Sequence, residues 1–257
     1  MHAVTRAGLV LAAALGAAAP LRAQGNTAEE LQRAIRLYEN VEIEQSLVIL
    51  NQIISPQSPY VVTEQQRVTA YKYLGAALAL QRGLPKRDSA VRYFRAALER
   101  DPFTDLDPQS FSPAQLAVFG AARGATFAVG LKPVEVDTVD PRIQRFRFRA
   151  LSTHNSRLRM EIRTPDDRVQ RVVYTGDNSG LREVEWDGVT DDGRLLPAGR
   201  YELVLLGTSR EIVTPQPAQD SARVFFRLDW LHAPLEDTLP TLQASDLLPE
   251  RWSPRAY

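Results

Sequence analysis

The chain has 257 residues, 44% of them hydrophobic, and its 31 basic and 31 acidic side chains leave no net charge. This length suits two globular domains, and the charge balance gives no sign of nucleic-acid or anionic-membrane binding. The absence of cysteine excludes disulfides, thiol catalysis and cysteine-ligated zinc. The three histidines, His2, His154 and His232, lie far apart in the sequence, so we expect no histidine-based metal site or catalytic triad.

Residues 1–23 have the features of a secretory signal peptide. Arg6 precedes an uncharged run over residues 7–19, Pro20 interrupts the run, and Ala23 is a small residue suited to cleavage. The run is shorter than the roughly 20 residues of a membrane-spanning helix, although an uncleaved anchor stays an alternative. We predict cleavage after Ala23 and a periplasmic or secreted mature protein without a transmembrane segment.

Residues 24–130 are predicted to form a helical domain, because hydrophobic residues recur there at helical spacing. Capping boxes at 27–30 and 63–66 predict two helix starts, and the second helix should run to about Gln81. A further helix is expected over 43–54, and another from Asp88 or Ser89 to about Glu99. Ser112-Pro113 opens a last helix, with proline at the favoured first position.

Two of these helices carry a family pattern. Tyr71, Leu74, Gly75 and Leu78 lie on the first of them, and Ala90, Phe94, Ala97 and Pro102 belong to the second. This pattern resembles a tetratricopeptide repeat, although the turn over 82–88 is longer than that family's. The resemblance implies helices that hold a peptide on a concave face. A spacer that packs only on its neighbour is the alternative.

The side of the helix over 63–81 that faces away from its partner is the predicted partner-binding stripe. It consists of Thr69, Lys72, Ala76, Ala79 and Leu80. Spacings of three and four place most of them on one face. By the resemblance this stripe would line the groove, with Lys72 meeting a carboxylate of an extended peptide or a partner helix. Alternatively, the N-terminal helices cover the stripe and bury it.

From about residue 131 the hydrophobic period becomes that of strands, so 131–230 is predicted to be a β domain. Residues 145–149 alternate arginine with phenylalanine, which places the phenylalanines in the core and the arginines on a solvated face, or on a binding stripe for an anionic polymer. Similar segments lie at 158–162, 169–174, 181–186, 201–206 and 224–228. About seven short antiparallel strands are typical of a sandwich.

The most specific motif is W-D-G at 186–188, followed by D-G-R at 192–194 and L-P-A-G-x-Y at 196–201. With the strands before it, from about Val139, it resembles the hairpin of FlgD-type immunoglobulin-like domains. The resemblance implies a non-catalytic β-sandwich accessory module. Asp187, Asp191 and Asp192 are interpreted as turn residues, with a calcium site as the alternative. Trp186 should point into the core.

The sequence has no GxSxG, HExxH or P-loop motif, and we predict no catalytic residues and no cofactor. Residues 231–257 form a proline-punctuated tail that docks on the protein or on a partner, or stays disordered. We therefore predict helical hairpins followed by a sandwich, in an exported scaffold or adaptor of the bacterial cell envelope with a protein or peptide partner. The alternative is a carbohydrate- or cell-wall-binding module that uses aromatics such as Trp186 or Trp230. An enzyme predicts a deep pocket, and an adaptor a shallow groove.

Overall fold

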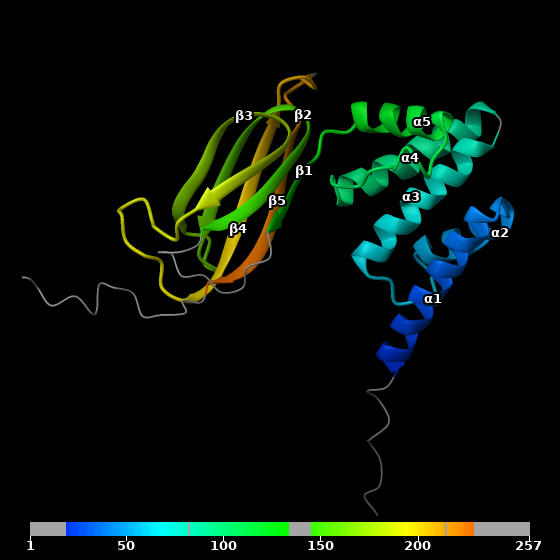
Figure 1. The fold of residues 1–257 in the computed structure, drawn as a ribbon, viewed down its shortest axis with the longest axis horizontal. Coiled ribbons are helices and arrows are strands. Elements are labelled where there is room, and N and C mark those ends of the chain that lie inside the picture. The colour runs from blue at the N-terminus through cyan, green and yellow to red at the C-terminus, as the bar shows by residue number, and fades with distance from the viewer. Residues whose placement is uncertain (1–18, 82, 134–144, 214, 229–257) are drawn as a thin grey trace, which may run out of the picture. The chain divides into compact units, whose positions relative to one another are not determined.

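The structure is a computed structural model that describes residues 19–81, 83–133, 145–213 and 215–228. In this part of the chain five helices precede five strands, which confirms the predicted order of α before β (Figure 1). The chain divides into two compact units, 1–126 and 127–257, called here the helical unit and the β unit. Most of the predicted signal peptide and all of the predicted tail lie outside the described residues.

The helices are α1 (Ala19–Glu39), α2 (Ile43–Ile54), α3 (Glu64–Leu80), α4 (Leu84–Arg100) and α5 (Pro113–Gly124). The capping box predicted at 63–66 opens α3, and α5 begins at Pro113, where proline at the first position predicts it. Thr63 and Gln66 form a reciprocal capping box at the start of α3, and Ser112 and Gln115 form another before α5. These bonds satisfy backbone N–H groups that have no partner inside the helix.

Two predicted helix starts are wrong. Thr27 does not cap a helix but lies inside α1, where its hydroxyl donates to the carbonyl oxygen of Val61 at 3.1 Å. Helix α4 begins at Leu84 rather than at Asp88 or Ser89, because Pro85 occupies its first turn, where a missing N–H costs nothing. The connection between α3 and α4 is therefore shorter than the predicted turn.

Close packing joins α3 to α4 as predicted. Phe94 has no exposed surface, and a Cβ atom added to Gly75 would lie 2.7 Å from its ring. Only glycine therefore fits at this crossing, and the buried Ala90 and Ala97 of α4 add no bulk. The ring of Phe119 from α5 meets Phe94 edge to face at 5.3 Å, which extends the core to the last helix.

The strands are β1 (Val129–Pro133), β2 (Phe146–Arg163), β3 (Val169–Trp186), β4 (Gly199–Ser209) and β5 (Gln219–Leu228). All pair antiparallel in one sheet of order β1-β2-β4-β5, with β3 on the other side of β2. The prediction of about seven short strands is wrong for the described residues. The segments 145–149 and 158–162 lie in or beside one long strand, β2, and 169–174 and 181–186 both belong to β3.

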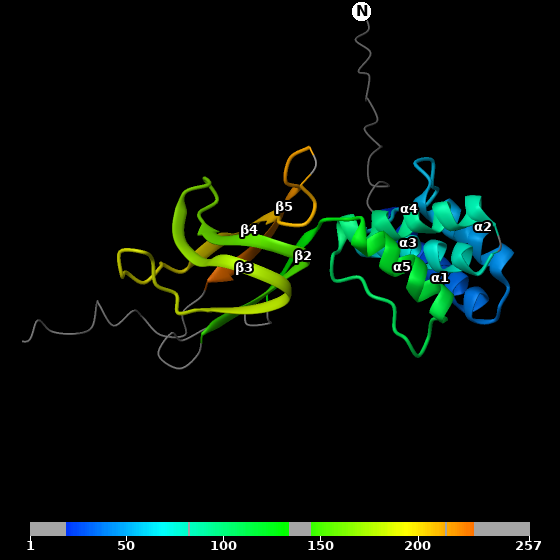
Figure 2. The same ribbon diagram turned by 90° about the horizontal axis from the view of Figure 1, so that it is seen from above.

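The sheet is curled (Figure 2), and β2 carries the bend. Its register against β3 shifts between Ser152 and Ser156, where extra residues on β2 form a bulge. The first half of β2 pairs with β1 and the second half with β4. Beyond the sheet pairing, the backbone N–H of Val129 donates to the Asp220 carboxylate on β5 at 2.8 Å, which brings β1 beside the last strand.

Side chains on the inner surface of this sheet form the core of the β unit. Phe146 and Phe148 are buried, whereas Arg147 and Arg149 are exposed, so the predicted alternation is confirmed. The exposed side is balanced in charge at this point, because Arg149 pairs with Glu183 on β3 at 2.8 Å. The second half of β2 continues the core with Leu158, Met160 and Ile162.

We predict that fragments 24–126 and 127–228 each unfold cooperatively on their own, since each has its own hydrophobic core. A β fragment starting at residue 131 should be less stable, because it lacks Val129, which pairs with Ser152 and lies over Gly207. Denaturant titration followed by circular dichroism measures both fragments. A non-cooperative transition in the 127–228 fragment would contradict its independence.

Candidate partner-binding site

Helix α5 packs on the predicted partner-binding stripe of α3 and buries its centre at Ala76. Ala76 has no exposed surface, and its carbonyl oxygen accepts a hydrogen bond of 2.9 Å from Gln115 Nε2 of α5. The same Nε2 donates to the hydroxyl of Tyr38 at 2.5 Å. The prediction that Ala76 contacts a partner is therefore wrong. Its small side chain instead permits close approach of a helix from later in the chain.

Lys72 is engaged by the segment that leads into α5. Its Nζ lies 5.3 Å from the centre of the Phe111 ring, a cation–π distance. Burial lowers the pKa of Lys72, against the opposing effect of Asp105 and Asp107. Thr69 donates its hydroxyl to the carbonyl oxygen of Gln65 within α3 at 2.9 Å. Neither residue belongs to the lining of the hollow that includes Ala79.

The open part of the stripe is its C-terminal end. A hollow of about 460 Å³ lies there between α3, α4 and α5, and we call it the α3–α5 groove. Its lining is Ala79, Gln81, Gly83, Leu84, Arg87, Ala114, Ala117 and Val118. Leu84 in this lining is 74% exposed, and Leu80 at the end of α3 is 45% exposed. Ala79 lines this groove, whereas Leu80 is exposed but does not belong to its lining, so partner binding by both residues stays a prediction.

The remaining groove residues were not predicted. Leu84 belongs to the predicted turn over 82–88, whereas it begins α4 in the structure. Ala114 and Ala117 lie on α5, which reaches α3 only in the folded chain. No local pattern in the sequence signals that contact.

One polar group in the groove lacks a partner among the described residues. Gln81 donates its Nε2 to Glu44 at 2.6 Å, but its Oε1 is buried and accepts no hydrogen bond there. A buried acceptor without a donor is unfavourable by about 1–3 kcal/mol. Arg87 adds a cation to the same lining.

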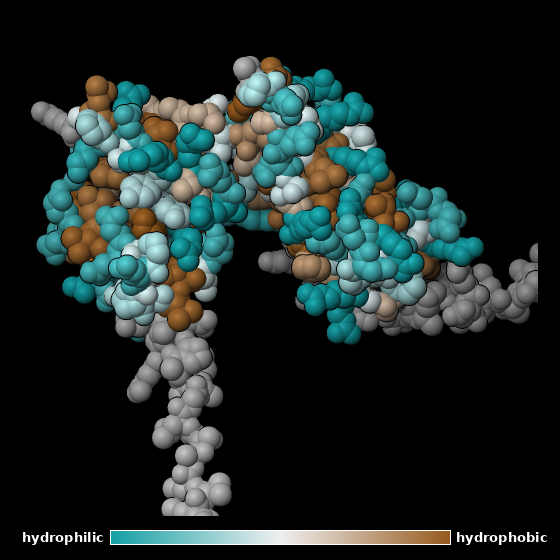
Figure 3. Space-filling view, turned by 180° about the vertical axis from the view of Figure 1, so that it is seen from behind, coloured by the Kyte–Doolittle hydropathy of each residue, from teal (hydrophilic) through white to brown (hydrophobic). Residues whose placement is uncertain are grey.

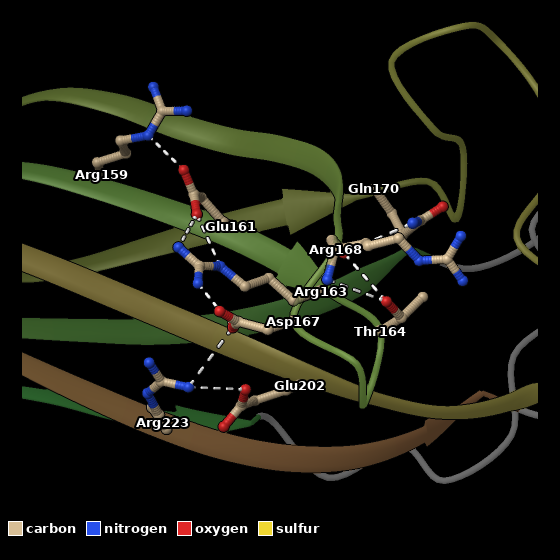
Figure 4. Close-up of polar contacts among 9 residues, drawn as sticks. All are labelled: Arg159, Glu161, Arg163, Thr164, Asp167, Arg168, Gln170, Glu202 and Arg223. Atoms are coloured by element: carbon tan, nitrogen blue, oxygen red, sulfur yellow. Dashed lines mark hydrogen bonds and ion pairs between the residues drawn. The ribbon is translucent and has the colours of Figure 1, made fainter.

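The β unit contains a different polar cluster, drawn in Figure 4. Glu161 is 3% exposed and accepts hydrogen bonds from Arg159 and, at 2.5 and 2.9 Å, from Arg163. Arg163 also binds Asp167 at 2.7 Å. On the neighbouring strands Arg223 donates to Glu202 at 3.1 Å and lies 3.7 Å from Asp167.

Electrostatics makes this cluster a structural clamp. Burial works against ionisation of Glu161, but the hydrogen bonds from Arg159 and Arg163 outweigh it and hold the pKa below its ordinary value of 4.5. Glu161 is thus an anion held between two guanidinium groups of β2, and one of these, Arg163, joins β2 to the turn that holds Asp167. A group so firmly ionised is poorly suited to exchange protons near neutral pH.

The hairpin residues serve the core and the turns. Trp186 is 3% exposed, as predicted, and its Nε1 donates to the carbonyl oxygen of Val189 at 2.8 Å. It therefore presents no ring face to a carbohydrate. Asp187 accepts from the Val189 N–H at 3.2 Å, and Asp191 pairs with Arg171 at 3.1 Å. In the described ranges no three acidic or histidine side chains gather as a metal site.

Another hollow, of about 860 Å³, is open to solvent beside the bulge of β2. Its charged side chains pair with polar neighbours. Arg210 binds Asp177 at 2.6 Å, and Asn155 donates to Glu211.

Among the described helices, none is long and apolar enough to cross a membrane.

Comparisons with known proteins identify no family for this chain. No protein-family model and no curated protein sequence matches the chain. Among solved structures it is similar to the Pseudomonas fluorescens alkylpurine DNA glycosylase AlkC bound to DNA containing an abasic site analog, with 11% identity and a TM-score of 0.24. The match covers 72% of this chain and spans 64% of the glycosylase chain. A TM-score this low carries no argument about fold or function.

Proposed function

We propose that this protein is an exported, non-catalytic adaptor that holds a protein partner in the α3–α5 groove. The observation that supports this most is the groove itself, where small apolar walls, the exposed Leu84 and the cationic Arg87 come together. The groove is open rather than deep, as expected of a peptide-binding surface. The tetratricopeptide-like pair of α3 and α4 agrees with this role.

The partner's chemistry follows from the lining. Ala79, Ala114 and Ala117 leave room for an apolar side chain, which Leu84 would cover. An acidic side chain of the partner would meet Arg87, which lines the groove. An extended peptide or an amphipathic helix with one apolar anchor and one carboxylate fits these requirements. In this proposal the β unit is an immunoglobulin-like accessory module of the FlgD type.

A photocrosslinker in place of Leu84 tests the groove in the native cell envelope. We expect one defined partner band, and we expect Ala117→Arg to abolish it, because a long cation would fill the groove. Ala117 is exposed, so the unfolding midpoint should stay unchanged. The matched control is a crosslinker at Val48, an equally apolar exposed residue on α2 outside the groove. The same band from Val48, or its survival in Ala117→Arg, would reject the groove.

Export is tested by sequencing the N-terminus of the mature protein. We expect the chain to begin at Gln24 or within a few residues of it, as the signal-like sequence over 1–23 predicts. Cleavage there leaves the helical core intact, since the buried Thr27, Leu31 and Ala34 of α1 all follow it. A mature protein that keeps Met1 would reject signal cleavage.

A further inference from the structure

The hollow beside the bulge of β2, about 860 Å³ in volume, is called here the bulge hollow. Its volume lies within the range of roughly 300–1,000 Å³ that is usual for ligand sites. Nine of its ten lining residues are polar or charged, and the tenth, Leu181, is 58% exposed. Hydrophilic side chains also surround the hydrophobic patches on the face of the β unit in Figure 3. The bulge hollow therefore suits a ligand rich in hydroxyl groups, which can satisfy many polar groups at once.

Arg182 on β3 is held in a fixed position in this lining. Its Nε donates to Oδ1 of Asn178 at 2.9 Å, and its guanidinium carbon lies 4.7 Å from the ring centre of Tyr174. Asn178 is only 7% exposed, and its Nδ2 donates to the carbonyl oxygen of Gly180 at 2.8 Å. The hydroxyl of Tyr174 donates to the carbonyl oxygen of Asp177 at 2.9 Å. Because both supports are themselves bonded, the guanidinium plane is defined before any ligand arrives.

The two terminal nitrogens of Arg182 have no bonded acceptor among the described residues, where its Nε alone donates. The other arginine of the lining is different, because Arg210 donates both its Nε and its Nη2 to Asp177, at 3.0 and 2.6 Å. Glu183 of the same lining pairs with Arg149 at 2.8 Å, so its charge is compensated. A guanidinium group with free donors binds a carboxylate through two parallel N–H bonds. Arg182 therefore provides an unused carboxylate site in a polar hollow.

We propose that the bulge hollow binds an acidic saccharide and that Arg182 holds the carboxylate of this sugar. The sugar hydroxyls bond to the polar lining, where Ser179 is a donor and the carboxylate of Glu211 is an acceptor. The C–H face of the sugar ring lies against the exposed Leu181. A peptide with an acidic side chain carries the same carboxylate, but its other side chains need apolar pockets, which this lining does not provide.

Isothermal titration calorimetry with the full chain tests the ligand class. The acidic probes are trigalacturonate and 3′-sialyllactose, and their uncharged counterparts are the methyl ester of trigalacturonate and lactose. We expect at least one acidic sugar to bind about tenfold or more tightly than its uncharged counterpart, because the bond to Arg182 is charge-assisted. This difference should shrink as salt is added. If neither acidic sugar binds, or if each binds no better than its counterpart, the proposal is overturned.

Variants of the chain test the assignment to Arg182. Arg182→Gln should weaken binding of the acidic sugar by about tenfold or more and leave the unfolding midpoint nearly unchanged, since Arg182 is exposed. The matched control is Arg147→Gln, which replaces an exposed arginine of β2 outside the lining and should leave the affinity unchanged. Equal losses in the two variants overturn the proposal. Tighter binding of the capped dipeptide N-acetyl-Glu-Leu amide than of either acidic sugar indicates a peptide site and overturns it as well.

Discussion

Replacing Trp186 with Ala is expected to destabilise the β unit by about 3–5 kcal/mol, the range for truncating a large buried aromatic side chain. The indole ring is almost fully buried, and its centre lies 5.3 Å from Phe146 and 6.3 Å from Phe226. The collapse of such a site is limited by the strands on either side, so a cavity should remain. Equilibrium denaturation of the full chain measures the loss.

Trp186→Phe separates packing from hydrogen bonding. Phenylalanine keeps most of the apolar contact but leaves the Val189 carbonyl oxygen without the indole N–H. The expected loss is about 1–3 kcal/mol, smaller than that of Trp186→Ala. Leu181→Ala on the same strand is the control and should cost well under 1 kcal/mol, because Leu181 is exposed. Equal losses for Trp186→Ala and Leu181→Ala would contradict a core role for Trp186.

Local chemistry made parts of this fold predictable. The caps at Thr63 and Ser112 depend on side chains three residues away, and the burial of Phe146 and Phe148 depends on simple alternation. Such rules operate within a few residues of sequence. They succeed wherever the distant parts of the chain leave the local preference undisturbed.

The errors arose where distant contacts decided the outcome. The polar stretch between Ser152 and Ser156 resembles a turn, yet pairing with β3 and β4 carries it through as a bulge in one strand. The small apolar stripe on α3 has the same composition whether it receives a peptide or a helix of its own chain. Helix α5 buries Ala76, where Gln115 donates a hydrogen bond to the Ala76 carbonyl oxygen. Ala79 lies beyond this contact and lines the α3–α5 groove.

Replacing Glu161 with Gln is expected to destabilise the β unit by about 2–4 kcal/mol at neutral pH. Breaking a fully buried ion pair costs about 3–5 kcal/mol. The half-exposed Arg159 can regain water, so the expected loss of unfolding free energy is smaller. Arg163 is only 15% exposed and keeps Asp167 as its remaining partner. The control is Glu183→Gln, which removes the exposed pair with Arg149 and should cost less than about 1 kcal/mol.

The dependence of this effect on pH identifies its origin. Because folding lowers the pKa of Glu161 below its ordinary 4.5, the folded state binds this proton less readily than the unfolded state. The stabilisation is therefore complete above about pH 4.5 and is lost as pH falls through the folded value. The gap in unfolding free energy between the native chain and Glu161→Gln should narrow on acidification below pH 4.5. Titration of carboxylates outside this cluster affects both proteins alike and cancels in this difference, whereas Asp167 shares Arg163 with Glu161 and titrates together with it. A gap that stays constant down to pH 2.5 would mean that the shape of Glu161, and not its charge, holds β2 to the Asp167 turn.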